Sequence, residues 1–169
     1  TVIIALHGIS GAARDFEALG RVLAKQSPST SMYALNLRGL GYDPDPESQG
    51  DIADPDLWMR DVRELQQALA TRHPGARFIW LGESMGSLIA LHAAATDPKP
   101  DGLILASPVV SNGAVSSSQN VLLPLGARFL PTGRVSLEDL SGDEDFQMTS
   151  SSNHFGQARK NPYHIDRYS

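Results

Sequence analysis

The chain has 169 residues, a net charge of −5 at pH 7 and no cysteine; 41% of its residues are hydrophobic and 20% are charged. This length and composition fit a single packed domain, and the lack of cysteine excludes disulfides, catalytic thiols and cysteine–zinc sites. Lysine and arginine are scattered, which argues against nucleic acid as a partner, and no apolar run approaches the roughly 20 residues that span a bilayer.

Strands and helices are expected to alternate over the first 110 residues. Unbroken apolar runs predict buried strands, and apolar residues at helical spacing, closed by breakers such as His73-Pro74-Gly75, predict the helices between them. In chain order we expect a strand over 1–7, a helix over 12–25, a strand over 32–37, a helix from 54 to about 72, a strand over 77–81, a helix over 85–96 and a strand over 102–106. This alternation predicts an α/β fold with a mostly parallel sheet flanked by helices.

The character of the sequence changes after Pro108. Residues 111–120 are rich in Ser, Asn and Gly, residues 122–130 are apolar, and residues 137–146 are acidic. No further alternation of strand and helix follows. We therefore separate a core over residues 1–110 from a second segment over residues 111–169, and a poorly ordered stretch remains an alternative for 111–120.

The most informative motif is Gly82-Glu83-Ser84-Met85-Gly86, between the strand that ends at Leu81 and a helix of small residues. This G-x-S-x-G pattern is typical of a sharp strand-to-helix turn that exposes a serine hydroxyl above a sheet. A side chain at either glycine would collide with neighbouring backbone, which is why the motif needs Gly82 and Gly86. The pattern predicts Ser84 as a nucleophile at a helix N-terminus, where negative charge is favoured.

Two further motifs are expected beside Ser84. The first strand runs into His7-Gly8-Ile9, and the second into Arg38-Gly39-Leu40-Gly41. Because the carboxyl ends of parallel strands meet at one edge of a sheet, where ligands bind, we expect these loops and Ser84 to lie together.

These three motifs, in this order, resemble the α/β-hydrolase superfamily, and in particular its monoglyceride lipase and lysophospholipase branch, which is grouped with serine aminopeptidase-like hydrolases. The sequence departs from the pattern at Asn36, where the family usually has Asp, and at Leu40, where it often has His. The resemblance covers residues 1–110 well and implies an α/β-hydrolase fold, here represented by its amino-terminal half. It also implies that residues 111–169 form a cap, or lid, inserted over the site.

The resemblance further implies an oxyanion hole built from backbone N–H groups. One belongs to Met85, directly after the nucleophile, and the other to Ile9. His7 and Gly8 are then residues that shape the loop, and Glu83 supports it rather than acting as a base.

The remaining members of a catalytic triad are expected after Ser84, because α/β-hydrolases have the chain order Ser, acid, His. His92 lies eight residues along the same helix, about 12 Å from Ser84, and is interpreted as a residue of the helix face. We assign neither the acid nor the base to the later candidates His154, His164, Asp143, Glu144 and Asp145. The chain begins within a strand and without Met, so we expect a part of a longer hydrolase whose acid and histidine lie beyond Ser169.

Two functions follow. The first is a serine hydrolase of carboxylic esters, with a small-molecule or lipid substrate such as a monoacylglycerol or lysophospholipid. The alternative is a non-catalytic binding module of the same fold that lacks a complete triad. Neither needs a cofactor, and the five histidines show no metalloenzyme spacing, so no metal is expected. We expect a cytoplasmic protein, with peripheral contact to a membrane left open.

Overall fold

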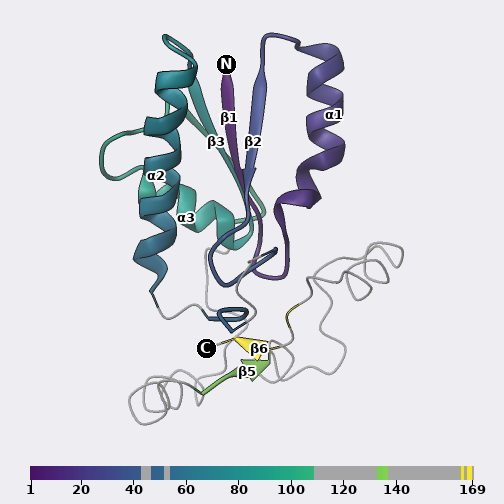
Figure 1. Ribbon diagram of the computed structural model, residues 1–169, viewed down its shortest axis with the longest axis vertical. Helices are drawn as coiled ribbons and strands as arrows, with labels where there is room; N and C mark the ends of the chain where they lie inside the picture. Colours follow the sequence, from purple (N-terminus) through teal and green to yellow (C-terminus); the bar gives the residue numbers. More distant parts are fainter. Residues whose placement is uncertain (43–46, 52–53, 109–132, 137–164, 166, 169) are drawn as a thin grey trace.

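The computed structural model describes residues 1–42, 47–51, 54–108, 133–136, 165 and 167–168. Its main body is a four-stranded sheet in the order β2-β1-β3-β4 (Figure 1). The strands are β1 (Val2–Leu6), β2 (Ser31–Leu35), β3 (Phe78–Glu83) and β4 (Gly102–Ala106). All three pairings are parallel, which confirms the predicted parallel sheet.

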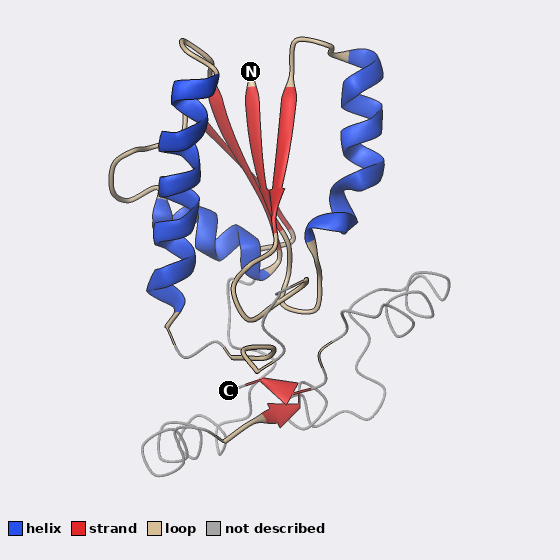
Figure 2. Ribbon diagram, viewed as in Figure 1, coloured by secondary structure: helices blue, strands red, loops and turns tan. Residues whose placement is uncertain are grey.

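Helices flank the sheet on both sides (Figure 2). They are the short 3-10 helix η1 (Ala13–Phe16), followed by α1 (Glu17–Gln26), α2 (Pro55–Arg72) and α3 (Met85–Ala93). Helix α2 begins where the sequence predicts, because the Asp54 side chain accepts the N–H of Asp56 and Pro55 occupies the first turn, where its missing N–H costs nothing. The helix predicted over 12–25 is divided into η1 and α1, and α3 ends three residues earlier than predicted.

The order of the strands places a switch point between β1 and β3. The chain passes from β1 through α1 to β2 on one side, then returns through α2 to β3 on the other side of β1. At such a point the loops after the two central strands separate toward opposite faces, and the space between them is where open α/β sheets bind ligands. The candidate site therefore lies at the ends of β1 and β3.

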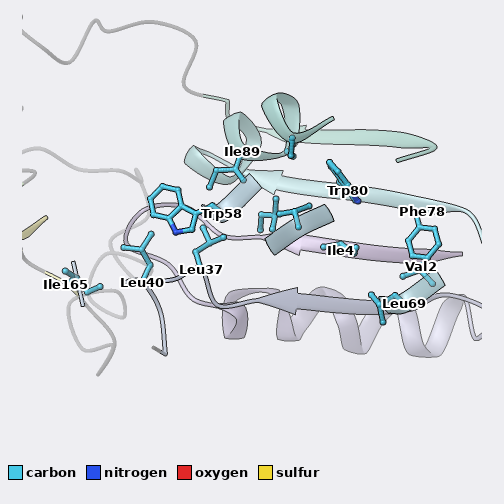
Figure 3. Close-up of a cluster of buried hydrophobic side chains, with 14 of the residues drawn as sticks. Val2, Ile4, Leu37, Leu40, Trp58, Leu69, Phe78, Trp80, Ile89 and Ile165 are labelled. Carbon is cyan, nitrogen blue, oxygen red and sulfur yellow. The ribbon is translucent and has the colours of Figure 1, made fainter. Parts of the chain in front are cut away.

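The larger part of the core lies between the sheet and helices α2 and α3. Figure 3 shows its side chains along the strands, from Val2, Phe78 and Leu69 at one end to Trp58 and Leu40 at the other. Trp80, fully buried at its centre, donates its indole N–H to Gln66 Oε1 at 2.7 Å, and Gln66 in turn donates to the Lys99 carbonyl. This pairing satisfies the polar atoms that the core encloses.

The opposite face of the sheet carries a smaller cluster, formed by Ala5, Phe16 and Leu81. Only part of the apolar stripe that the sequence predicts for the first helix is buried against this face. Phe16 is buried, whereas Leu19 and Val22 are 40% and 47% exposed. Among the described residues α1 has no buried side chain. Fewer buried side chains therefore anchor the helix on this face than on the face covered by α2 and α3.

Most of the predicted cap, residues 111–169, lies outside the described residues. Its described parts include two short strands, β5 (Val135–Ser136) and β6 (Arg167–Tyr168), which pair antiparallel. They lie beyond the carboxyl ends of the large sheet (Figure 1). Strand β6 and Arg134, which directly precedes β5, contact the loop after β2. A Cβ on Gly50 would collide with the Arg167 carbonyl, and Arg134 donates to the Gln49 carbonyl at 2.6 Å. No helix in the described ranges is long and apolar enough to cross a membrane.

Candidate active site

Ser84 stands at the turn between β3 and α3, as the sequence predicts. Its φ of 51° and ψ of −116° lie in a region that residues other than glycine rarely adopt. Such a conformation costs about 1–3 kcal/mol and persists only where the surroundings enforce it. Here the Ser84 N–H donates to the Ala106 carbonyl at 2.9 Å, and the Ser84 carbonyl accepts the N–H of Ser87 at 3.0 Å. The serine is thereby fixed between β4 and the first turn of α3.

The two glycines of the motif are required by lack of space. A Cβ on Gly82 would collide with the Gly86 carbonyl and lie 2.5 Å from the Ser87 Cα. A Cβ on Gly86 would collide with the Leu6 carbonyl and lie 2.7 Å from that of His7. The first glycine thus lets the turn close on itself, and the second lets α3 approach the end of β1. The collision predicted from the sequence is confirmed at both positions.

Sequence reasoning missed Ser87, which completes this turn. Its side chain is fully buried and its Oγ lies 2.7 Å from the Gly82 carbonyl and 3.0 Å from the Ala106 carbonyl. A single hydroxyl proton can serve either acceptor, so Ser87 links the carboxyl ends of β3 and β4 to α3. The sequence offers only an unspecific signal, a small polar residue near the start of a mostly apolar helix.

His7 lies at the end of β1 and is completely buried. Its Nε2 accepts the Leu37 N–H at 3.1 Å, which leaves the proton on Nδ1, and Nδ1 donates to the Gly8 carbonyl at 2.7 Å. Burial lowers the pKa of His7 below the usual histidine value, because it disfavours the charged ring. Both ring nitrogens are engaged, so this neutral imidazole connects the loop after β1 to the loop after β2.

The backbone after His7 passes directly beside Ser84. A Cβ on Gly8 would lie 3.3 Å from the Ser84 Cβ and 3.8 Å from its Oγ. The Gly8 carbonyl accepts two hydrogen bonds, from His7 Nδ1 and from the Gly11 N–H at 3.0 Å. The N–H of Ile9 belongs to the same peptide group and points in the opposite direction. Fixing this carbonyl therefore fixes the direction of the Ile9 N–H.

The two predicted oxyanion donors are the N–H groups of Ile9 and Met85. Met85 is the first residue of α3, where backbone N–H groups have no partner within the helix. In the described part of the chain, neither N–H donates to another residue. Both side chains are partly buried and pack against the main core cluster.

Glu83 precedes the serine and is exposed as a whole residue. Partial desolvation of its carboxyl raises the pKa of Glu83, and the negative charge of Asp15 acts in the same direction. The Asp15 carboxylate caps η1 by accepting the Ala12 N–H at 2.8 Å. The surroundings of the turn therefore disfavour the ionised form of this carboxyl.

The third predicted motif lies in the loop after β2. Arg38 forms a bidentate ion pair with Asp61 of α2, at 2.6 and 2.8 Å. The Arg38 carbonyl accepts the indole N–H of Trp58. Asn36, where the resembled family usually has Asp, accepts the Ala13 N–H through Oδ1 at 2.9 Å. An amide oxygen is sufficient for this contact, which explains how the loop accommodates the departure.

We assign neither the histidine nor the acid of the triad to a described residue near Ser84. His92 lies on α3, as interpreted from the sequence, and is exposed. The other candidates weighed above, His154, His164, Asp143, Glu144 and Asp145, lie outside the described residues. Within the described ranges no group of three or more His, Asp or Glu side chains could hold a metal ion.

The chain belongs to the family described as serine aminopeptidase S33, whose model matches residues 1–169. Among curated proteins, the pimeloyl-(acyl-carrier protein) methyl ester esterase of Xylella fastidiosa is 35% identical over 104 residues. That alignment covers 60% of this chain and 35% of the esterase, so the chain matches about a third of the length of this relative.

Solved structures show the same fold. The monoacylglycerol lipase of Paleococcus ferrophilus superposes with a TM-score of 0.79 at 19% identity, over 99% of this chain and 61% of the lipase. A soluble variant of the monoglyceride lipase of Saccharomyces cerevisiae, in complex with a substrate analogue, superposes with a TM-score of 0.79 at 20% identity. This match covers 99% of this chain and 55% of that lipase. The fold is that of an α/β-hydrolase, and the resemblance drawn from the three motifs is confirmed.

Proposed function

We propose that the protein is a serine hydrolase of carboxylic esters in which Ser84 is the nucleophile. The observation that carries this proposal is the strained backbone of Ser84 at the switch point of the sheet, beside the N–H groups of Ile9 and Met85, which have no acceptor among the described residues. Strain of this kind is retained where a side chain must be held in an exposed reactive position. Family membership supports a hydrolase, and the similar esterase and lipases support esters as the bond cleaved.

The proposed chemistry has two steps. Ser84 Oγ attacks the ester carbonyl carbon, and the carbonyl electrons move to oxygen, which the N–H groups of Ile9 and Met85 stabilise. The tetrahedral intermediate collapses to an acyl-serine and releases the alcohol, and water then releases the acid. The histidine that takes the serine proton, and the acid that orients it, are expected in a part of the complete protein other than the described residues.

For the substrate we propose a monoacyl lipid ester, such as a monoacylglycerol or lysophospholipid. Two similar solved structures are monoacylglycerol lipases, and the curated relative cleaves a methyl ester, so an acyl chain on the acid side is common to them. Such a substrate partitions into lipid surfaces, so peripheral membrane contact belongs to this proposal. The family description names an aminopeptidase, which makes an amide substrate the competing possibility to be assayed.

The test uses the complete protein that carries this sequence. Wild type and Ser84→Ala are treated with a fluorophosphonate, the labelled peptide is identified by mass spectrometry, and hydrolysis of monoacylglycerol, p-nitrophenyl esters and aminoacyl amides is measured. We expect label on Ser84 only, ester turnover well above amide turnover, and a loss of about 10⁴-fold or more in Ser84→Ala. An unlabelled wild type that binds a monoacyl lipid without turnover would instead support the non-catalytic binding module.

A further inference from the structure

Tyr168 reaches the loop after β1 from the far end of the chain. It belongs to β6, and its side chain is only 2% exposed. Its hydroxyl lies 3.2 Å from Ser10 Oγ and donates to the Ile9 carbonyl at 3.4 Å. The contact therefore joins residues 158 and 159 positions apart in the sequence.

The position of this contact matters because of what flanks the Ile9 N–H. On one side, the Gly8 carbonyl is held by His7 and Gly11. On the other side, the Ile9 carbonyl is held by Tyr168. A backbone has two soft dihedral angles per residue, so fixing the peptide groups on both sides of Ile9 fixes its φ and ψ.

Either oxygen of the Tyr168–Ser10 pair could be the donor, and the contact with the Ile9 carbonyl requires one of the two arrangements. Tyr168 donates its single proton to the Ile9 carbonyl, so Ser10 must donate to the Tyr168 oxygen if the pair is bonded. The two hydrogen bonds, from Ser10 to Tyr168 and from Tyr168 to Ile9, then form a ring with the peptide group between Ile9 and Ser10. Removal of either hydroxyl would loosen the same carbonyl.

The segment that carries Tyr168 is docked independently of its hydroxyl. Ile165 is buried and belongs to the main core cluster. Gly50 touches the Arg167 backbone so closely that any side chain there would collide. Loss of the hydroxyl alone should therefore leave β6 in place, which separates a positioning role from a packing role.

We propose that Tyr168 is a positioning residue for the oxyanion hole, acting on the Ile9 N–H through the Ile9 carbonyl. The inference rests on the proposed function, in which Ile9 stabilises the charge on the ester oxygen. It extends that function, because Tyr168 of β6 then helps to hold the loop that carries the Ile9 N–H. A donor displaced by a fraction of an ångström still binds substrate and loses stabilisation of the transition state.

The experiment compares Tyr168→Phe, Ser10→Ala and the double variant with wild type in the complete protein. The matched control is Tyr33→Phe, which removes a tyrosine hydroxyl bonded to His73 Nε2 at 2.7 Å, away from the candidate site. For each protein we would measure kcat, KM, the melting temperature, and inhibition by a trifluoromethyl ketone with the same acyl chain. This ketone forms a hemiketal with the serine, and its oxyanion needs the same N–H donors.

We expect kcat to fall about ten-fold in Tyr168→Phe, with KM within about two-fold, and ketone inhibition to weaken by the same factor as kcat. Ser10→Ala should show a smaller effect of the same kind, and the double variant should lose less than the product of the two single losses. Tyr33→Phe should change the melting temperature and leave kcat and ketone inhibition unchanged.

A Tyr168→Phe variant with wild-type kcat and wild-type ketone inhibition would overturn the proposal. So would a Tyr168→Phe variant whose melting temperature falls as in Tyr33→Phe and whose fall in kcat is not matched by weaker ketone inhibition, since that pattern indicates a general effect on stability. If the wild-type protein is not labelled at Ser84 by a fluorophosphonate, the proposed function itself fails, and this result is distinct from both.

Discussion

The two halves of the candidate site are held in place by different means. The turn around Ser84 depends above all on close packing, because the backbone around Gly82 and Gly86 leaves no room for a side chain at either position. The loop from His7 to Gly11 is fixed by hydrogen bonds, and the groups that make them come from Leu37 and Tyr168 as well as from the loop itself. One half therefore depends on the absence of side chains at two positions, and the other on hydrogen-bonding groups supplied by other parts of the chain.

This difference determines how each half should fail. A side chain at Gly82 or Gly86 creates a collision with backbone atoms that a change of pH does not relieve. The loop should instead respond to protonation of His7 and to changes in residues that touch no substrate. The three predictions below test this contrast, from the largest expected effect to the smallest.

Gly86→Ala should have the largest effect. The new methyl group would collide with the Leu6 carbonyl and lie 2.7 Å from that of His7, so α3 must move away from β1. We expect a loss of about 3 kcal/mol or more in the free energy of unfolding. Turnover should fall by at least about 10²-fold, because Ser84 moves with the helix. Urea denaturation and ester hydrolysis measure the two effects.

The control for this variant is Gly20→Ala in α1. The nearest atom to a Cβ at Gly20 is Met32 Sδ at 3.9 Å, so the methyl group fits, and alanine is favoured in a helix by about 0.5–1 kcal/mol. Gly20→Ala should therefore stabilise the protein slightly without changing turnover. Equal behaviour of the two alanine variants would refute the account of the turn.

His7→Ala should have an intermediate effect that depends on pH. The variant leaves the Leu37 N–H without its acceptor and frees one of two bonds to the Gly8 carbonyl, which should cost about 2–4 kcal/mol near neutral pH. The measurement is urea denaturation of both proteins between about pH 7.5 and about pH 5, on either side of the usual histidine pKa.

The direction of the pH effect follows from the lowered pKa of His7. A histidine whose pKa is depressed by folding contributes its full stability above the pKa of the unfolded chain, about 6.5, and loses it as pH falls toward the folded pKa. The stability difference between wild type and His7→Ala should therefore shrink on acidification. Parallel curves over this range would show that His7 is not held neutral in the folded protein.

Glu83→Gln should have the smallest effect on the free energy of unfolding, and it should raise the stability where the other two substitutions lower it. Folding raises the pKa of Glu83, so its stability contribution is complete below the unfolded pKa and is lost as pH rises through the folded pKa. Replacing the carboxylate should stabilise the protein by a few tenths of a kcal/mol at neutral pH, since the group is exposed and screened, and the gain should vanish in acid. Thermal unfolding of Glu83→Gln and of the exposed control Glu64→Gln would measure it. An equal gain in both variants would show that the effect does not come from the surroundings of Glu83.

The sequence predicted the parts of this molecule that have a short sequence signature. The four strands, the start of α2 at Asp54 and Pro55, and the need for glycine at both positions of the turn follow from such patterns, although the atoms that Gly86 meets belong to Leu6 and His7. Ser87 was missed because a hydroxyl inside a helix has no specific signature until its acceptors on β3 and β4 are known. The contact of Tyr168 with Ile9 could not be predicted, since nothing local to either residue indicates a partner 159 positions away.

The departures within the predicted motifs are explained by contacts that the sequence does not show. Asn36 replaces an expected Asp and still serves its loop, because one oxygen suffices for the Ala13 N–H. Leu40 stands where the family often has His, and it is fully buried in the core beside Ile165 (Figure 3). A motif therefore predicts where the backbone goes more reliably than which side chain accompanies it.

The most direct test of the two-part site is a crystal structure of the complete protein with a phosphonate bound to Ser84. The account predicts that the phosphoryl oxygen lies within about 3.1 Å of the backbone nitrogens of both Ile9 and Met85, with Tyr168 still bonded to the Ile9 carbonyl. A phosphoryl oxygen that contacts only Met85, or a phosphonate attached to a serine other than Ser84, would contradict it.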